Sequence, residues 1–165
     1  MRLPAAVIRG RGWASTDRAE EVAALSAIEG VKFVDGSLNL IAGVPVWLAP
    51  DSAVYRNGSQ VFWRASLDGL SVMIGRWTSG CPAHVFEIFA GVRLRDALNL
   101  QDGDIVNLDI PDEIVSSPGP SLRDRLIWNL FWKFRERLIY RDGFYMTLMH
   151  NRTVRGYAWR SMQKE

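Results

Sequence analysis

The sequence predicts a mainly β protein, a compact barrel of short strands with a separate C-terminal extension. From residue 38 to residue 110, short apolar runs alternate with turn dipeptides, which is typical of small barrels and not of doubly wound sheets. A single helical pattern precedes these runs. Residues 111–120 (PDEIVSSPGP) form a linker by composition, with three prolines and two serines, and a long helical pattern follows.

The first expected elements are a strand over residues 5–9 and a helix that ends before Gly30. Asp17 is the expected N-cap, because Glu20 follows three residues later and completes a capping box. Gly30 is a natural stop after the last helical turn. One apolar stripe lies between these ends: Val22, Leu25 and Ile28.

Short strands are expected next. Asp68-Gly69 is the strongest hairpin signal in the chain, because both residues tolerate the positive φ of a two-residue turn. Asp102-Gly103 is a second turn and leads into the last strand. The expected strands cover residues 38–41, 44–48, 60–67, 70–77, 85–90 and 105–110, with a helical turn at 94–98.

The C-terminal extension is predicted to be a long helix and a final hairpin. Ser121 and Asp124 form a capping box, and the helix runs to about Tyr140. Apolar residues recur on one side of it, at Leu122, Leu126, Leu130, Phe134 and Leu138. We divide the chain into a barrel domain (1–112) and an extension (113–165) packed on the barrel. A dimer interface and a helix lying on a membrane surface are the alternatives for the apolar side.

Composition excludes several classes of protein. One cysteine and two histidines leave no disulfide framework and no zinc cluster. No run of about 20 apolar residues predicts a transmembrane helix, and the apolar run near the N-terminus is too short for a secretory signal. We therefore expect a cytoplasmic protein. Residues 1–112 carry 10 basic and 13 acidic side chains, whereas residues 113–165 carry 10 and 5.

Three segments stand out for chemistry, although the P-loop, the dinucleotide fingerprint, the zinc-protease motif and the nucleophile elbow are all absent. They are VIRGRGWA (7–14), DGSLNL (35–40) and HVFEIFAGVRLRDALNLQDGDIVNLDI (84–110). Taken alone, Ser37 and Asn39 can belong to an ordinary turn, Glu87 to the solvent face of a strand, and Arg93 and Arg95 to a solvated surface.

In this order and at these spacings, the segments resemble the archaeal-type CTP-dependent riboflavin kinase family over residues 5–110. That family reads approximately E-I-I-A-P-x-x-L-R-x-x-L-x-L-x-D-G-D-x-V in its last block. The matching residues here are Glu87-Ile88-x-Ala90, Leu94-Arg95, Leu98, Leu100 and Asp102-Gly103-Asp104-x-Val106. The resemblance implies a six-stranded cradle-loop barrel, related to the RIFT barrels. It also implies transfer of the γ-phosphoryl group of CTP to the 5′-hydroxyl of riboflavin, which gives FMN and CDP.

The resemblance also implies roles for particular residues. Ser37 and Asn39 would bind Mg²⁺, and their hard oxygen atoms suit that ion. Glu87 would be catalytic, orienting the acceptor hydroxyl or taking its proton, and would contact the acceptor together with Thr78. Close backbone approach to the nucleotide phosphates is expected at Gly10, Gly12 and Gly36, and Arg11 would add a further phosphate contact.

The sequence departs from the family pattern around these positions. Arg9 stands where the family has serine, Trp13 where it has glutamate and Asp35 where it has proline. The adjacent histidine and proline of the family are not intact here, because Ala83 separates Pro82 from His84. Two alternatives therefore stay open. One is phosphorylation of another small alcohol, such as a sugar or a lipid-linked alcohol. The other is a non-catalytic barrel that binds nucleic acid or a partner protein. For the kinase, the expected partners are small molecules, namely CTP and riboflavin or a similar alcohol, and nucleic acid is not expected. The expected oligomeric state is a monomer or a homodimer.

Overall fold

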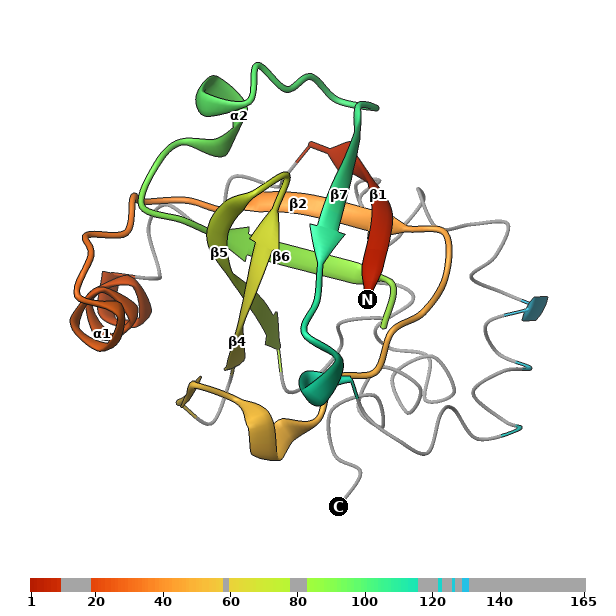
Figure 1. Cartoon of the computed structure of the whole chain (residues 1–165), viewed down its shortest axis with the longest axis horizontal. Helices are drawn as coiled ribbons and strands as arrows, with labels where there is room; N and C mark the ends of the chain where they lie inside the picture. Colours follow the sequence, from red (N-terminus) through yellow and green to blue (C-terminus); the bar gives the residue numbers. More distant parts are fainter. Residues whose placement is uncertain are drawn as a thin grey trace, which may run out of the picture.

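A computed structural model describes residues 1–9, 19–57, 60–77 and 83–115, together with Leu122, Leu126, Asn129 and Leu130. These residues form a closed antiparallel barrel of six strands with a few short helices around it (Figure 1). The mainly β, six-stranded barrel expected from the sequence is therefore confirmed.

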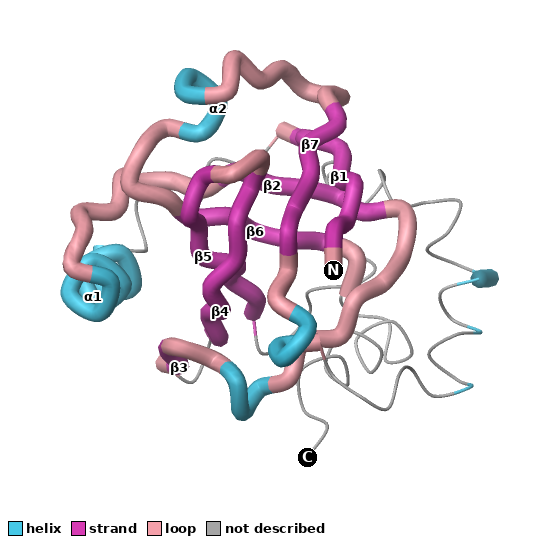
Figure 2. The backbone as a smooth tube through the Cα atoms, viewed as in Figure 1, coloured by secondary structure: helices cyan, strands magenta, loops and turns pink. Residues whose placement is uncertain are grey.

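The barrel is one continuous ring of hydrogen-bonded strands, seen as a single magenta unit in Figure 2. The ring runs β4-β5-β6-β2-β1-β7, and the pairing of β7 with β4 closes it at Ser66↔Asp109 and Leu67↔Leu108. The two-residue β3 is added outside the ring, on β4. The strands are β1 (Arg2–Ile8), β2 (Leu38–Ala42), β3 (Tyr55–Arg56), β4 (Gln60–Leu67), β5 (Leu70–Trp77), β6 (Val85–Phe89) and β7 (Ile105–Asp109).

The interior of the barrel is filled by alternate residues of each strand, as the period of two requires. In β1, for example, Leu3, Ala5 and Val7 are buried, whereas the residues between them are more exposed. The largest side chain of this interior is Trp63, whose indole N–H donates to the carbonyl of Ala49 at 2.8 Å. Because inward positions are apolar, polar residues of the same strands face outward.

A second, smaller core lies on the outside of the barrel, under α1 (Ala19–Glu29). Figure 1 shows α1 at the flank of the barrel, apart from the closed ring. The helix ends at Gly30, whose φ of +67° is the left-handed conformation expected of a C′ residue. The buried members of this outer core are Val22, Leu25, Phe33, Phe62, Met73 and Phe89.

Gly75 makes the close packing of this outer core possible. A Cβ at this position would lie 2.7 Å from Cε2 of Phe89 and 2.9 Å from Cε1 of Phe62. We expect Gly75→Ala to lower the free energy of unfolding by about 1–3 kcal/mol, because two buried rings must move. Urea unfolding measures this loss. Gly43→Ala is the control, since a Cβ there meets nothing within 4 Å. Equal losses in both variants would contradict the account.

The expected hairpin turn at Asp68-Gly69 is confirmed. Both residues have positive φ, 44° and 87°, which is the conformation of a type I′ turn. The turn joins β4 to β5 at the pair Leu67↔Leu70. The Asp68 carboxylate also accepts a hydrogen bond from the side-chain amide of Asn107 at 3.0 Å, which ties the turn to β7.

The prediction of a strand over residues 44–48 is wrong. Only Leu48 pairs there, in an isolated bridge with Val115. Pro45 has no N–H to contribute to a ladder, and Val46 forms its backbone bonds elsewhere, its N–H donating to the carbonyl of Ala83 at 2.9 Å. The expected helical turn near 94–98 is present as α2 (Leu94–Ala97), and short 3₁₀ helices span Pro50–Ser52 and Asp112–Ile114.

The barrel continues slightly past the predicted boundary at residue 112, because Ile114 is buried in its core. Within the expected long helix, Leu122 and Leu126 are α-helical, and Asn129 and Leu130 form a π-helical step. The rest of the helix, the final hairpin and their packing lie outside the described residues and stay predictions. A membrane-spanning helix, which needs a long apolar stretch, is not found among the described residues.

Candidate functional site

The register of β2 on β6 brings two of the predicted site residues side by side. Asn39 lies directly opposite Glu87 in this antiparallel pair. Both face the outside of the barrel, because their neighbours along each strand, such as Leu40 and Ile88, fill the interior. Both are half-buried. A carbonyl and a carboxylate therefore share one partly shielded position on the outer surface.

Ser37 completes this group. Its hydroxyl donates a hydrogen bond to Oε1 of Glu87 at 2.6 Å, across 50 residues of sequence. Ser37 is also half-buried and precedes the first residue of β2. Predicted separately as metal ligands and catalytic base, Ser37, Asn39 and Glu87 thus form one cluster, which we call the SNE cluster.

Gly36 sets the direction in which the chain enters β2. Its φ of +99° lies in the region that favours glycine, and the space next to it is open. A side chain at this position would strain the backbone just before Ser37. Of the residues predicted to contact phosphates, Gly36 is the one that the structure describes. Gly10, Arg11 and Gly12, and the predicted acceptor contact Thr78, lie outside the described residues.

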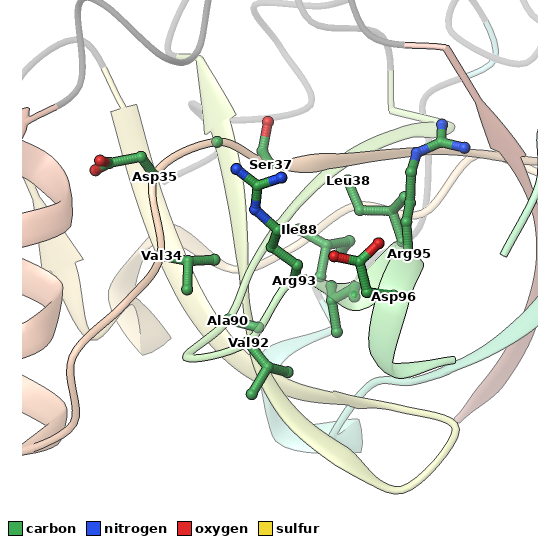
Figure 3. Close-up of a pocket in the computed structure, with 12 residues that line it drawn as sticks. Val34, Asp35, Ser37, Leu38, Ile88, Ala90, Val92, Arg93, Arg95 and Asp96 are labelled. Atoms are coloured by element: carbon green, nitrogen blue, oxygen red, sulfur yellow. The ribbon is translucent and has the colours of Figure 1, made fainter. Parts of the chain in front are cut away.

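A cavity of about 200 Å³ adjoins the SNE cluster at Ser37 (Figure 3). It lies between the segment that enters β2 and the segment from the end of β6 into α2. Its apolar lining is Val34, Leu38, Ile88, Ala90, Val92 and Leu94. Its polar lining is Asp35, Ser37, Arg93, Arg95 and Asp96. An apolar cavity with a few charged groups at its edge is the usual form of a small-molecule site.

The two arginines of the cavity differ in what they bind. Arg95 is held in place: its Nη2 lies 3.1 Å from the carbonyl oxygen of Ile8 and 2.6 Å from Oδ1 of Asp102. In the described part of the chain, the Arg93 side chain is exposed and forms no hydrogen bond or ion pair, whereas the Arg93 carbonyl accepts the backbone N–H groups of Asp96 and Ala97. Figure 3 shows its guanidinium group extending toward Ser37, whereas Asp35 points away. Arg93 is therefore the cation of this cavity that is available to a ligand.

The sequence pattern is typical of a solvated surface at both Arg93 and Arg95 and does not reveal this difference. The signal was weak, because the two arginines are neighbours in an otherwise ordinary surface segment. The role of Arg95 is instead structural. Together with the bonds from Val7 N–H to the Asp104 carbonyl and from Gly103 N–H to the Val7 carbonyl, it fixes the end of β1. The glycine segment that begins at Gly10 follows directly from this fixed end.

A buried polar pair lies close to the start of β6, the strand that carries Glu87. Arg76, on β5, is fully buried and donates from Nη1 to the carbonyl of Val46 and from Nη2 to that of Ala83, each at 2.7 Å. Its guanidinium carbon also lies 4.5 Å from the centre of the Phe86 ring. His84, equally buried, immediately precedes β6. The pattern of the sequence gave no role to Arg76.

His84 is neutral in the folded protein. Burial, and then the charge of Arg76, lower its pKa from 6.5 to about 3. The unfolded chain keeps the ordinary pKa, so it binds the proton more tightly than the folded chain does. The stability that neutral His84 contributes is thus complete above about pH 6.5 and is lost as the pH falls from there toward about 3.

We expect the free energy of unfolding to fall by roughly 1 kcal/mol per pH unit below about pH 6. Urea unfolding of the wild type and of His84→Gln between about pH 7 and pH 5 tests this expectation, because glutamine does not titrate. His150→Gln, at the other histidine of the sequence, serves as the control. An unchanged pH dependence in His84→Gln, or its loss in the control, would contradict the assignment.

The SNE cluster suits Mg²⁺ by the type of its donors. A hydroxyl, an amide carbonyl and a carboxylate are hard oxygen ligands, and Mg²⁺ in phosphotransferases takes few protein ligands beside water and phosphate. Across the described ranges, His, Cys, Asp and Glu side chains do not gather in threes as a metal site of their own.

No protein-family model matches the chain, and no curated protein matches it in sequence.

Proposed function

We propose that the chain is a Mg²⁺-dependent phosphotransferase, a CTP-dependent riboflavin kinase on a barrel of the cradle-loop type. The reaction transfers the γ-phosphoryl group of CTP to the 5′-hydroxyl of riboflavin and yields FMN and CDP. The observation that carries the proposal is the SNE cluster, in which Ser37 and Glu87 are joined at 2.6 Å and Asn39 lies opposite Glu87. The resemblance to the kinase family supplies the donor and the acceptor. A cytoplasmic location belongs to the same proposal.

Each residue of the cluster has a task in this reaction. Glu87 accepts the proton of the acceptor hydroxyl as the new bond between oxygen and the γ-phosphorus forms. The bond from the γ-phosphorus to its bridging oxygen breaks, and CDP leaves with the electron pair. Ser37 and Asn39 would hold a Mg²⁺ ion, which would supply positive charge near the phosphate oxygens. The hydrogen bond from Ser37 keeps the Glu87 carboxylate oriented before substrate binds.

The cavity beside the cluster fits one portion of a substrate. Its volume of about 200 Å³ is below the roughly 300–1,000 Å³ typical of pockets that enclose whole drug-sized ligands. We assign it to a base or sugar portion, with the phosphate groups outside it and close to Arg93. A guanidinium fork matches phosphate oxygens, and the guanidinium group of Arg93 forms no competing bond in the described part of the chain.

Arg93 is therefore expected to bind the triphosphate. Arg93→Gln should raise the KM for CTP about tenfold, because a charge-assisted hydrogen bond is lost. The value of kcat should change less, since the SNE cluster is intact. Steady-state kinetics measure both constants. Arg56→Gln, at an exposed arginine that does not line the cavity, is the matched control. Unchanged KM in Arg93→Gln would remove Arg93 from the site.

The test of the proposal is product formation by the purified chain with Mg²⁺, riboflavin and either CTP or ATP. FMN measured by chromatography with CTP, and little with ATP, supports the proposal. CDP formed with another alcohol and not with riboflavin would keep the phosphotransferase and change the acceptor. No nucleotide consumption by folded protein would overturn it.

A further inference from the structure

The hydroxyl of Ser37 has the geometry of a nucleophile, besides its proposed role as a metal ligand. It donates its proton to Oε1 of Glu87 at 2.6 Å. A hydroxyl and a carboxylate within about 2.6–3.2 Å of each other are placed as a nucleophile and its general base. Protein kinases form the same pair with a substrate, since their catalytic aspartate accepts the proton of the substrate hydroxyl. Here both members of the pair belong to one chain.

The contrast with Ser26 shows that a short hydrogen bond alone does not make a nucleophile. The Ser26 hydroxyl also donates at 2.6 Å, but its acceptor is the backbone carbonyl of Val22, which is a very weak base. The same hydroxyl accepts the N–H of Phe33 at 2.9 Å, so it has a structural role. Ser37 differs because its partner is a carboxylate, which can keep the proton.

The surroundings of Ser37 suit an incoming phosphoryl group. Ser37 is half-buried and lines the cavity of about 200 Å³, so a small molecule can reach its hydroxyl. The space beside the preceding Gly36 is open, because a Cβ there would meet nothing within 4 Å. The guanidinium group of Arg93 extends toward Ser37 (Figure 3), and such a group matches phosphate oxygens. A nucleophile, a base and a cation directed toward them are thus present together.

We propose that Ser37 is itself phosphorylated by the bound nucleoside triphosphate when no alcohol occupies the site. Oγ of Ser37 forms a bond to the γ-phosphorus, and the hydroxyl proton passes to Glu87. The bond from the γ-phosphorus to its bridging oxygen breaks, and the nucleoside diphosphate leaves with the electron pair. This inference rests on the proposed phosphotransferase activity and adds a covalent modification site to it.

The test is incubation of the full chain with Mg²⁺ and γ-labelled CTP in the absence of riboflavin. Mass spectrometry of the intact chain and of its peptides should show one phosphoryl group, at Ser37. Ser37→Ala should abolish the labelling, whereas Ser37→Thr keeps a hydroxyl and should be labelled at the same position. Glu87→Gln should lower the labelling rate about 10²-fold, because an amide cannot accept the proton. Urea unfolding shows that each variant is folded.

The matched control is Ser52→Ala. The Ser52 hydroxyl donates to the backbone carbonyl of Glu113 and not to a carboxylate, so this variant should be labelled as fast as the wild type. A parallel incubation with riboflavin measures labelled FMN. Labelled FMN without any labelled protein, or label at a residue other than Ser37, would overturn this inference and leave the kinase proposal intact. Label at Ser37 without FMN would support the inference and discard riboflavin as the acceptor. Label in neither product would overturn both.

Discussion

Replacing Glu87 by glutamine is expected to lower the turnover of phosphoryl transfer by about 10²-fold or more. The amide cannot accept a proton from the acceptor hydroxyl, whereas the carboxylate can. The fold should tolerate the change, because the amide oxygen can still accept the hydrogen bond from Ser37 that Oε1 accepts at 2.6 Å. The measurement is kcat with saturating CTP and acceptor.

A matched variant separates catalysis from charge. Glu29→Gln also removes one carboxylate, at a residue that pairs with Arg64 and lies outside the SNE cluster. Its turnover should equal that of the wild type. A near-normal rate in Glu87→Gln, with the cluster otherwise unchanged, would remove Glu87 from the role of base and leave it only a positioning contact for Ser37.

The second large effect is expected at Arg76. Arg76→Leu should lower the free energy of unfolding by about 3 kcal/mol or more, because the carbonyls of Val46 and Ala83 lose charge-assisted hydrogen bonds and stay buried. The cation over the Phe86 ring is lost as well. Arg76→Lys should be intermediate, since a single ammonium group cannot reproduce the two-armed geometry. Urea unfolding gives the three values.

The control for Arg76 is Arg64→Leu. Arg64 is an exposed residue of β4 that pairs with the partly buried Glu29 at 2.9 Å, and a pair at the surface contributes about 1 kcal/mol. A loss in Arg76→Leu no greater than in Arg64→Leu would show that the two bonds from Arg76 are not needed for stability. Because Arg76 joins the loop at Val46 to Ala83 just before β6, the variant also tests whether this link holds β6 in position.

Local patterns predicted most of the barrel. The turn at Asp68-Gly69 was predicted correctly, because the tendency of both residues to adopt positive φ is a property of the dipeptide itself. Strands such as Gln60–Leu67 were predictable from their alternation. The segment at 44–48 was not, because its apolar residues also suit a loop that meets Ala83 and Arg76 through tertiary contacts. The two residues of β3 carry too little pattern to be recognised.

The candidate site was predictable only through the resemblance. The turn at Ser37 and the strand at Glu87 each have an ordinary structural explanation, and their contact depends on the register of β2 on β6, which no local pattern encodes. The same limit applies to Arg93 and Arg95. The two residues differ because Asp102 and the carbonyl of Ile8 reach one of them and not the other.

The most direct test of the central claim follows the γ-phosphoryl group itself. CTP labelled at the γ-phosphorus is incubated with Mg²⁺, riboflavin and the wild-type chain, Glu87→Gln or Asn39→Ala. The SNE cluster predicts label in FMN with the wild type, and about 10²-fold less with Glu87→Gln. Loss of labelled FMN in Asn39→Ala should be partly restored by higher Mg²⁺. Label that stays in CTP with the folded wild type, or equal labelling of FMN by all three proteins, would contradict the account.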